Sequence, residues 1–546
     1  MAGELVFTGG RAFCADAAGS FVDAVAVGGS RVIAVGDAAV SMVGPGTEVH
    51  DLAGGLLVPG FVDAHAHPVQ GGLERMRCDL TAVADVTGAQ PYLDAIAAYS
   101  RANPHLPWIL GGGWQMAAFP GGTPTAAMLD SVVADRPVLL PNRDHHGAWA
   151  NTAALELAGV DASTPDPADG RIERDASGAP TGTLHEGAMD LVSRFVPADT
   201  QDDHVAGLLA AQAYLHSLGI TGWQDAIIGD YANITDASAA YVRAIGAGQL
   251  TMRVVGALWW QRGRGTEQVA ELVAKRDALV AQGFQATSVK IMQDGIAENG
   301  TAGMLEPYLD GHGCATHNAG LSFVDPVALR THVTELDAAC FQVHVHAIGD
   351  RAVREALDAF EAARRANGLN DLRHHIAHIQ VIHPDDVPRF ADLKVAANMQ
   401  ALWAVHEPQM DELTIPFLGE PRVSWQYPFA DLERTGAMLA AGSDWPVSSP
   451  DPLAAIHVAV NRTPPDEVGV PPLLPGQRLD LTTALRAYTA GSAYLNHADD
   501  TGKIAVGAVA DLAVLDRDPF AGPAEEIGQT RVVATYVAGR RVYPTT

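Results

Sequence analysis

The stretch from Pro59 to His67 carries two histidines whose spacing suits metal binding. It reads as a buried strand that ends in His65 and His67, two residues apart. Because side chains of a strand alternate between its faces, both imidazoles point the same way. Two imidazoles side by side can chelate one metal ion, and histidine nitrogen suits Zn²⁺. The spacing therefore predicts a metal site at the end of this strand.

Other ionisable residues stand at the ends of later apolar runs. They are Lys290, His344, His346, His378 and Asp444. Each alone is weak evidence, since a lone strand histidine is more often a packed core residue. On successive strands of one barrel, however, they would all point into one cavity.

These residue types suit metal-assisted hydrolysis. A protonated lysine is a poor metal ligand, but an amine that reacts with CO2 becomes a carbamate, which can bridge two metal ions. An aspartate can bind metal and accept a proton from water whose pKa the metal lowers from about 15.7 to about 7.

The middle of the chain alternates apolar runs with Ala-rich stretches, the pattern of βα units in a parallel sheet. Eight runs are candidate strands: 59–67, 219–225, 252–258, 287–294, 341–346, 375–379, 394–400 and 437–444. Eight is the count of a (β/α)8 barrel, whose chemistry lies at the C-terminal strand ends. A doubly wound open sheet is the competing topology, but no Gly-rich phosphate fingerprint follows the first strand.

The two chain ends are rich in short Val-containing strands, and neither end is long enough to bury a good core alone. We therefore expect three parts. They are a composite β-sandwich from 1–58 and 503–546, the barrel from 59–80 and 206–502, and an inserted subdomain from 81–205. The insert could cap the pocket; a surface excursion is the alternative.

The formal net charge of −29 argues against a nucleic-acid partner and against binding to anionic membranes. Four scattered cysteines lack CxxC pairing, which is typical of reduced, packed thiols in the cytosol. The first ten residues lack a signal-peptide pattern, and no apolar run has membrane-span length. We therefore expect a soluble, cytoplasmic protein.

Six segments together resemble one family. They are Val58–His67, Lys290–Gly295 with Thr301–Tyr308, His344–Val353, Gly442–Val447 and Gly507–Asp516. On these motifs the chain resembles the amidohydrolase superfamily, and within it the amidohydrolase-3 branch, nearly end to end. N-substituted formamide deformylases look most similar within that branch. The resemblance implies a metal-dependent (β/α)8 barrel with a flanking β-sandwich.

The resemblance also implies a ligand set. His65 and His67 with Asp444 would hold one metal ion. A second ion would lie on His346 and His378, with carboxylated Lys290 as the bridge. One or two Zn²⁺ per chain are therefore expected, a mononuclear site being the alternative.

Several further residues are candidates for the pocket. His344 would either support a ligand or face the substrate, and His146 matches a branch motif that reaches the active site from the insert. Trp114 and Trp403 could wall an apolar pocket, with core packing as the alternative. Glu186 and Asp294 stand beside motifs, but we do not expect either to be catalytic.

The function implied is zinc-dependent hydrolysis of a C–N bond in a small linear amide of the N-acyl or N-formyl type. Asp444 would act as general base and then as general acid. Cyclic amides, lactones or carbamates, deamination, and a non-catalytic binding module are the alternatives. A homodimer is a further expectation from the resemblance.

Overall fold

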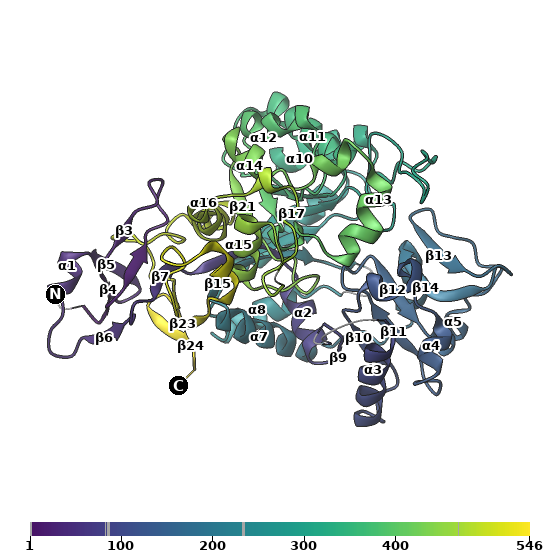
Figure 1. The fold of residues 1–546 in the computed structure, drawn as a ribbon, viewed down its shortest axis with the longest axis horizontal. Coiled ribbons are helices and arrows are strands. Elements are labelled where there is room, and N and C mark those ends of the chain that lie inside the picture. Colours follow the sequence, from purple (N-terminus) through teal and green to yellow (C-terminus); the bar gives the residue numbers. More distant parts are fainter. Residues whose placement is uncertain (1–2, 82, 84–87, 232–234, 468, 546) are drawn as a thin grey trace.

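Eight parallel strands form the central sheet of the computed structural model (Figure 1). Each strand pairs in parallel with the next along the chain, from β8 to β21. The strands are β8 (Phe61–Ala66), β15 (Ile220–Ile228), β16 (Arg253–Trp259), β17 (Gln285–Met292), β18 (Gln342–Ala347), β19 (His375–His378), β20 (Ala396–Met399) and β21 (Leu439–Ala441). All eight overlap the runs expected from the sequence, and the predicted (β/α)8 barrel is confirmed.

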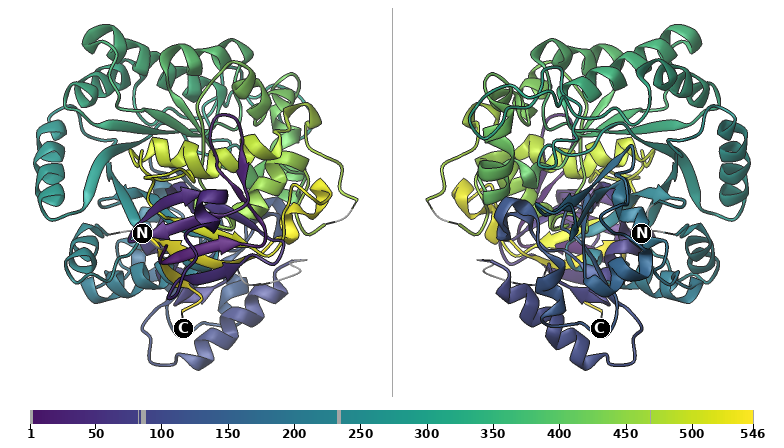
Figure 2. Two further views of the ribbon diagram at one scale, coloured as in Figure 1. Left: turned by 90° about the vertical axis from the view of Figure 1, so that its left-hand side faces the viewer. Right: turned by 90° about the vertical axis from the view of Figure 1, so that its right-hand side faces the viewer.

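Helices lie in an arc outside these strands (Figure 2). They include α7 (Gln201–Ser217), α8 (Ser238–Gly246), α9 (Gln268–Ala281), α10 (Pro326–Ala338), α11 (Asp350–Asn367), α12 (Val387–Leu393), α14 (Phe429–Arg434) and α15 (Pro452–Asn461). A capping box starts α7, because Thr200 and Asp203 each bond the other's backbone N–H. Helix α11 is amphipathic, and it buries residues such as Val353, Leu357 and Phe360.

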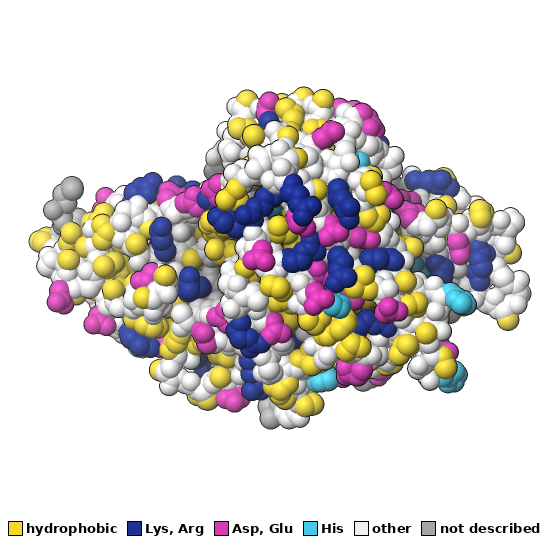
Figure 3. All heavy atoms as spheres, turned by 90° about the horizontal axis from the view of Figure 1, so that it is seen from above, with side chains coloured by type: hydrophobic (Ala, Val, Ile, Leu, Met, Phe, Trp, Pro, Cys, Tyr) yellow, Lys and Arg dark blue, Asp and Glu magenta, His cyan; other side chains and the backbone are white. Residues whose placement is uncertain are grey.

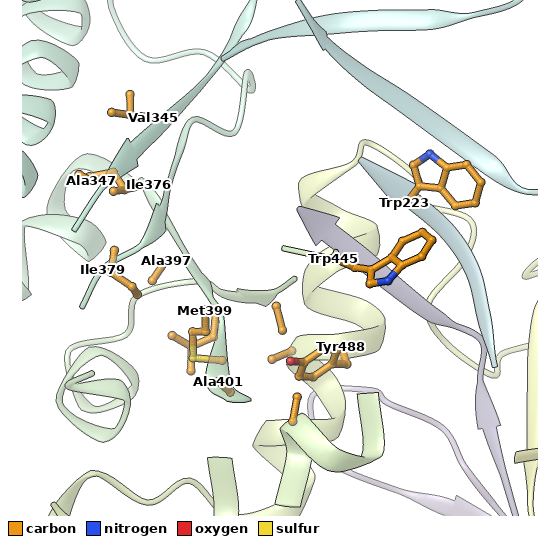
Figure 4. Packing of buried hydrophobic residues seen from close by; sticks show 14 of the residues in the cluster. Trp223, Val345, Ala347, Ile376, Ile379, Ala397, Met399, Ala401, Trp445 and Tyr488 are labelled. Carbon is orange, nitrogen blue, oxygen red and sulfur yellow. The ribbon is translucent and has the colours of Figure 1, made fainter. Parts of the chain in front are cut away.

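The barrel core is built from short aliphatic residues of the strands. Ile376 of β19 and Ala397 and Met399 of β20 belong to one buried cluster (Figure 4). Strands β18, β19 and β20 are buried along their whole length, as expected for a parallel sheet covered by helices. Polar side chains on these strands are therefore held in place by the apolar residues that pack around them.

The first and last strands are joined just beyond the end of β21. The backbone N–H of Asp444 donates to the carbonyl of His65 at 2.7 Å, and that of His67 donates to Trp445 at 2.7 Å. A Cβ added at Gly442 would lie 2.6 Å from the backbone nitrogen of His65. Only glycine therefore permits this close approach of the two strand ends.

The two chain ends share one sheet, because β7 (Leu56–Pro59) pairs antiparallel with β22 (Leu512–Leu515). The remaining strands of this six-stranded sheet are β2 (Arg11–Phe13), β3 (Phe21–Val22), β23 (Val532–Val537) and β24 (Arg540–Tyr543). A four-stranded sheet joins β1 (Leu5–Thr8), β4 (Val25–Gly28), β5 (Arg31–Val35) and β6 (Glu48–Asp51). Apolar residues of both sheets, among them Phe7 and Leu512, form a core of their own.

A further six-stranded sheet lies between the first and second barrel strands in the sequence and at the opposite end of the molecule from the terminal sheets (Figure 1). Its strands are β9 (Cys78–Asp79), β10 (Ile109–Gly112), β11 (Val138–Pro141), β12 (Gly147–Ala150), β13 (Gly170–Arg174) and β14 (Pro180–Glu186). Helix α2 (Pro68–Arg75) leads into it, and it carries α3 (Gln90–Ala102), α4 (Ala126–Asp130), α5 (Thr152–Ala158) and α6 (Asp190–Ser193).

The structure describes residues 3–81, 83, 88–231, 235–467 and 469–545; residues 82 and 84–87 of the predicted insert lie outside this part. No helix in the described ranges is long and apolar enough to cross a membrane. On the face in Figure 3, Lys and Arg side chains gather near the middle with Asp and Glu beside them. Cys14 and Cys78 are buried, but Cys314 and Cys340 are exposed, so the interpretation of all four as packed thiols is wrong.

Candidate metal centre

His65, His67 and Asp444 meet where the first and last barrel strands join. His65 is the penultimate residue of β8, and Asp444 follows β21. Atom Oδ1 of Asp444 lies 3.0 Å from Nε2 of His65 and 2.9 Å from Nε2 of His67. The buried Asp63 carboxylate ties the strands together by accepting the backbone N–H of both His65 and Ser443, each at 3.0 Å. The structure therefore brings these three predicted ligands to one point.

Lys290, His346 and His378 complete the group. The Nζ atom of Lys290 lies 3.4 Å from Nε2 of His65. The His378 ring has its centroid 4.7 Å from that of His65 and 4.4 Å from that of His346. All six predicted ligands line one cavity of about 620 Å³.

The donor atoms fit a metal ion. One ligand atom each from His65, His378 and Asp444 lies within 4.8 Å of the others. The Nδ1 atoms of His67 and His378 are buried and have no hydrogen-bond partner. Buried polar atoms normally have hydrogen-bond partners, so unpartnered nitrogens of this kind are available to bind a metal ion. Histidine nitrogens together with a carboxylate are donors typical of a zinc site.

Burial sets the charge states of this group. It lowers the pKa of Lys290 to about 7 and that of His65 to about 3. Burial would raise the pKa of Asp444, but the nearby His65 and hydrogen bonds from both histidines hold it well below its usual value. The site therefore offers a neutral His65 imidazole and an ionised Asp444 carboxylate, the forms that bind metal.

His344 lies behind His65 and does not line the described cavity. It is fully buried, and its Nε2 atom lies 2.8 Å from Nδ1 of His65. His344 therefore contacts a predicted ligand from outside the cavity. Its role in supporting His65 stays a prediction, and its position does not fit direct contact with the substrate. The His344 ring also packs on His375, with centroids 3.9 Å apart. His375 begins β19, and nothing in the sequence distinguished it from a lone core histidine.

His146 reaches the cavity from the insert, as the sequence suggested. Its Nδ1 atom lies 2.9 Å from Oε1 of Glu186, which also accepts the Thr301 hydroxyl at 2.9 Å. Burial would lower the pKa of His146, but the charge and hydrogen bond of Glu186 outweigh it and raise the pKa to about 9. Glu186 has φ of 51°, a strained backbone found most often at functional sites. Nothing in the sequence indicated that Glu186 pairs with His146.

The two predicted tryptophans differ in position. Trp403 lines the cavity and stacks on His378, with ring centroids 5.4 Å apart and planes 7° apart. Trp114 is only 1% exposed in the core of the insert, where its Nε1–H donates to the Leu140 carbonyl at 2.7 Å. The prediction that Trp114 contacts substrate is corrected accordingly, because its ring packs against Phe119 and Trp149.

Asp294 supports the second pair of histidines. It is fully buried and accepts backbone N–H groups of Gly303, Ile348 and Gly349 at 2.9 to 3.0 Å. Its carboxylate lies 3.4 Å from Nε2 of His346. Asp294 is therefore placed to orient His346. The sequence could not show this, because its partners come from its own loop after β17 and from the loop after β18.

Comparisons with known proteins identify the class and the family of this chain. The structure of an uncharacterized metal-dependent hydrolase from Pyrococcus furiosus superposes with a TM-score of 0.70 at 26% identity, covering 94% of this chain and 99% of that one. Fold and site thus define a metal-dependent hydrolase. The model of the Amidohydrolase family matches residues 48–543, so the chain belongs to this family. The predicted family and enzyme class are confirmed.

Two relatives match nearly end to end. Protein LONG AFTER FAR-RED 3 of Arabidopsis thaliana is 32% identical over 99% of this chain and 92% of its own length. N-substituted formamide deformylase of Arthrobacter pascens is 27% identical over 96% of this chain and 95% of its own.

Proposed function

We propose that this hydrolase cleaves the C–N bond of a small linear amide of the N-acyl or N-formyl type, with zinc as its metal. The observation that carries the proposal is the convergence of His65, His67 and Asp444 on one point of a cavity. Similarity to an N-substituted formamide deformylase supports the choice of bond.

Zinc suits the histidine-rich donor set, and when bound it supplies an activated water and polarises the scissile carbonyl. His65 and His67 with Asp444 would hold one ion, and His346 and His378 a second. Lys290 would bridge them as a carbamate. Its pKa of about 7 favours this reaction, because only the uncharged amine attacks CO2.

Asp444 would accept the proton of the attacking water and then deliver it to the departing nitrogen. Its low pKa keeps it ionised and ready to accept that proton. His146, held by Glu186, would donate a hydrogen bond to the carbonyl oxygen as negative charge develops there. Trp403, which lines the same cavity, would pack against the substrate.

A screen of N-formyl and N-acyl amines, with lactones and esters as comparison substrates, tests the proposed bond. We expect the zinc-loaded protein to hydrolyse the amides. Turnover of lactones or esters without any turnover of amides would refute the C–N assignment. The cytoplasmic location and the homodimer remain predictions.

A further inference from the structure

A cavity of about 570 Å³ adjoins the metal site at the C-terminal end of the barrel. Its walls come from the insert and from the loops that follow β17, β18, β19, β20 and β21. Glu298 and Glu407 line this cavity but not the metal-site cavity, and we call it the carboxylate cavity. Five residues line both cavities: Asp144, Ile296, Ile348, Trp403 and Val447.

Glu298 and Glu407 have no cationic partner. Oε1 of Glu298 accepts the Thr414 hydroxyl at 3.0 Å, and neither carboxylate forms an ion pair with a described residue. Burial raises the pKa of Glu298 to about 7 and also raises that of Glu407, although the charge of Arg143 opposes the second shift. A cation bound beside two such carboxylates would stabilise their charged forms.

The arginines near this cavity are engaged elsewhere. Arg143 is the only Lys or Arg among its described lining residues, and its Nε–H donates to the carbonyl of Val447 at 3.0 Å. Arg462 is fully buried outside the lining, where its Nε donates to the carbonyl of Leu473 at 2.8 Å. The cavity wall is therefore acidic, as is the whole chain with its net charge of −29, and such a site attracts cations.

Two more polar side chains in the wall lack partners. Gln380 and Tyr427 are 3% and 2% exposed, and both line the cavity. Nε2 of Gln380 donates to Gln426 at 3.1 Å, but no described residue donates to its Oε1. The Tyr427 hydroxyl has no hydrogen-bond partner within the described ranges either. Because buried polar atoms are normally paired, these two oxygens are available to a ligand that carries N–H donors.

The rest of the wall favours an organic cation over a metal ion. Ile296, Met410 and Val447 supply apolar surface, and the Trp403 ring can contact a cation through its π face. An alkyl chain would cover the apolar residues while an ammonium donates hydrogen bonds to the carboxylates. Within the described part of the chain, three metal-ligating side chains meet only outside this cavity, at His65, His378 and Asp444.

We propose that the carboxylate cavity binds a primary alkylammonium group. Its three N–H donors bond Glu298, Glu407 and Oε1 of Gln380. The group belongs either to the tail of an amide substrate or to a separate small amine. Binding in this cavity does not depend on the proposed amide hydrolysis.

The test measures binding of n-butylammonium to the zinc-loaded protein by calorimetry, about one pH unit above the pKa of Glu298. 1-Butanol and butanoate are the neutral and anionic comparisons. We expect n-butylammonium to bind about tenfold more tightly than either, because only the ammonium can make charge-assisted hydrogen bonds to the carboxylates. Glu407→Gln should weaken this binding about tenfold. Glu156→Gln, on an exposed residue of α5, is the matched control and should bind as the wild type does.

Equal binding of n-butylammonium and 1-butanol, or undiminished binding in Glu407→Gln, would overturn the proposal. If Glu407→Gln fails to fold, Glu298→Gln removes the neighbouring charge, and the comparison of the three ligands in the wild type needs no variant. The binding result stands whether or not any amide is hydrolysed.

Turnover then distinguishes the two sources of the ammonium. A kcat/KM about tenfold higher for N-(5-aminopentyl)formamide than for N-hexylformamide, with the preference lost in Glu407→Gln, supports an ammonium carried by the substrate. Equal kcat/KM for the two amides, together with binding of n-butylammonium, supports a separate amine.

Discussion

Nε2 of His344 lies 2.8 Å from Nδ1 of His65, and both rings are buried. If His65 binds the metal through Nε2, its Nδ1 carries the proton and donates to His344. This contact fixes both the tautomer and the ring orientation of His65. Most metal-binding histidines donate to a carboxylate or a carbonyl, whereas this one donates to another imidazole.

Replacing His344 should therefore weaken metal binding. We expect His344→Ala to raise the zinc Kd about tenfold to a hundredfold, because His65 loses its orienting partner. Competition with a chromophoric chelator measures the Kd. The exposed His105 provides the control His105→Ala, which should bind zinc as the wild type does. An unchanged Kd in His344→Ala would show that the contact does not position the ligand.

Asp444→Asn separates proton transfer from metal binding. The amide keeps an oxygen donor but cannot accept the proton of water, so kcat should fall about 10²-fold to 10⁴-fold. Zinc content should stay close to that of the wild type. The two readouts are turnover of an N-formyl amine and metal analysis of the same sample. A variant that retains full activity would remove Asp444 from the mechanism.

Loss of a proton from His146 should cause kcat/KM to fall at high pH, the alkaline limb of the pH profile. With a pKa of about 9, its imidazolium is present below that pH and is lost as pH rises through it. Glu186→Gln removes the charge that raises this pKa, so the limb should move to lower pH. His146→Asn should lower kcat/KM about 10²-fold at neutral pH. Profiles of kcat/KM with the same alkaline limb in the wild type and Glu186→Gln would contradict this role.

Lys290 should carry a carbamate in a pH-dependent manner. Its amine is uncharged above a pKa of about 7, so carboxylation should be present one pH unit above that value and decline below it. NMR of protein equilibrated with ¹³C-bicarbonate detects the carbamate carbon. Lys290→Gln should lack the signal and bind fewer zinc ions. Two bound zinc ions with no carbamate signal in the wild type would refute the bridge.

Much of the barrel could be predicted because each strand is a short apolar run bounded by turn residues. The spacing of His65 and His67 predicts a shared face from strand geometry alone. The position of Asp444 beside these two histidines does not follow from local spacing. It depends on closure of the barrel, which brings the first and last strands together at Gly442.

Other parts of the site depend on contacts that the sequence does not contain. Trp114 and Trp403 look alike as aromatic residues near motifs, yet one packs inside the insert and the other stacks on His378. The pairing of His146 with Glu186 joins the residue just before β12 to the last residue of β14, and Asp294 is held by separate loops. Tertiary packing decides the roles of these residues, and the local sequence pattern does not.

The central claim is that the histidine–aspartate cluster binds zinc and thereby hydrolyses a linear amide. The most direct measurement is zinc content together with N-hexylformamide turnover, before chelation, after it, and after zinc is restored. We predict one or two zinc ions per chain, loss of turnover with the metal, and recovery on adding zinc. Unchanged turnover in the metal-free protein, or no turnover of any amide by the zinc-loaded protein, would contradict the account.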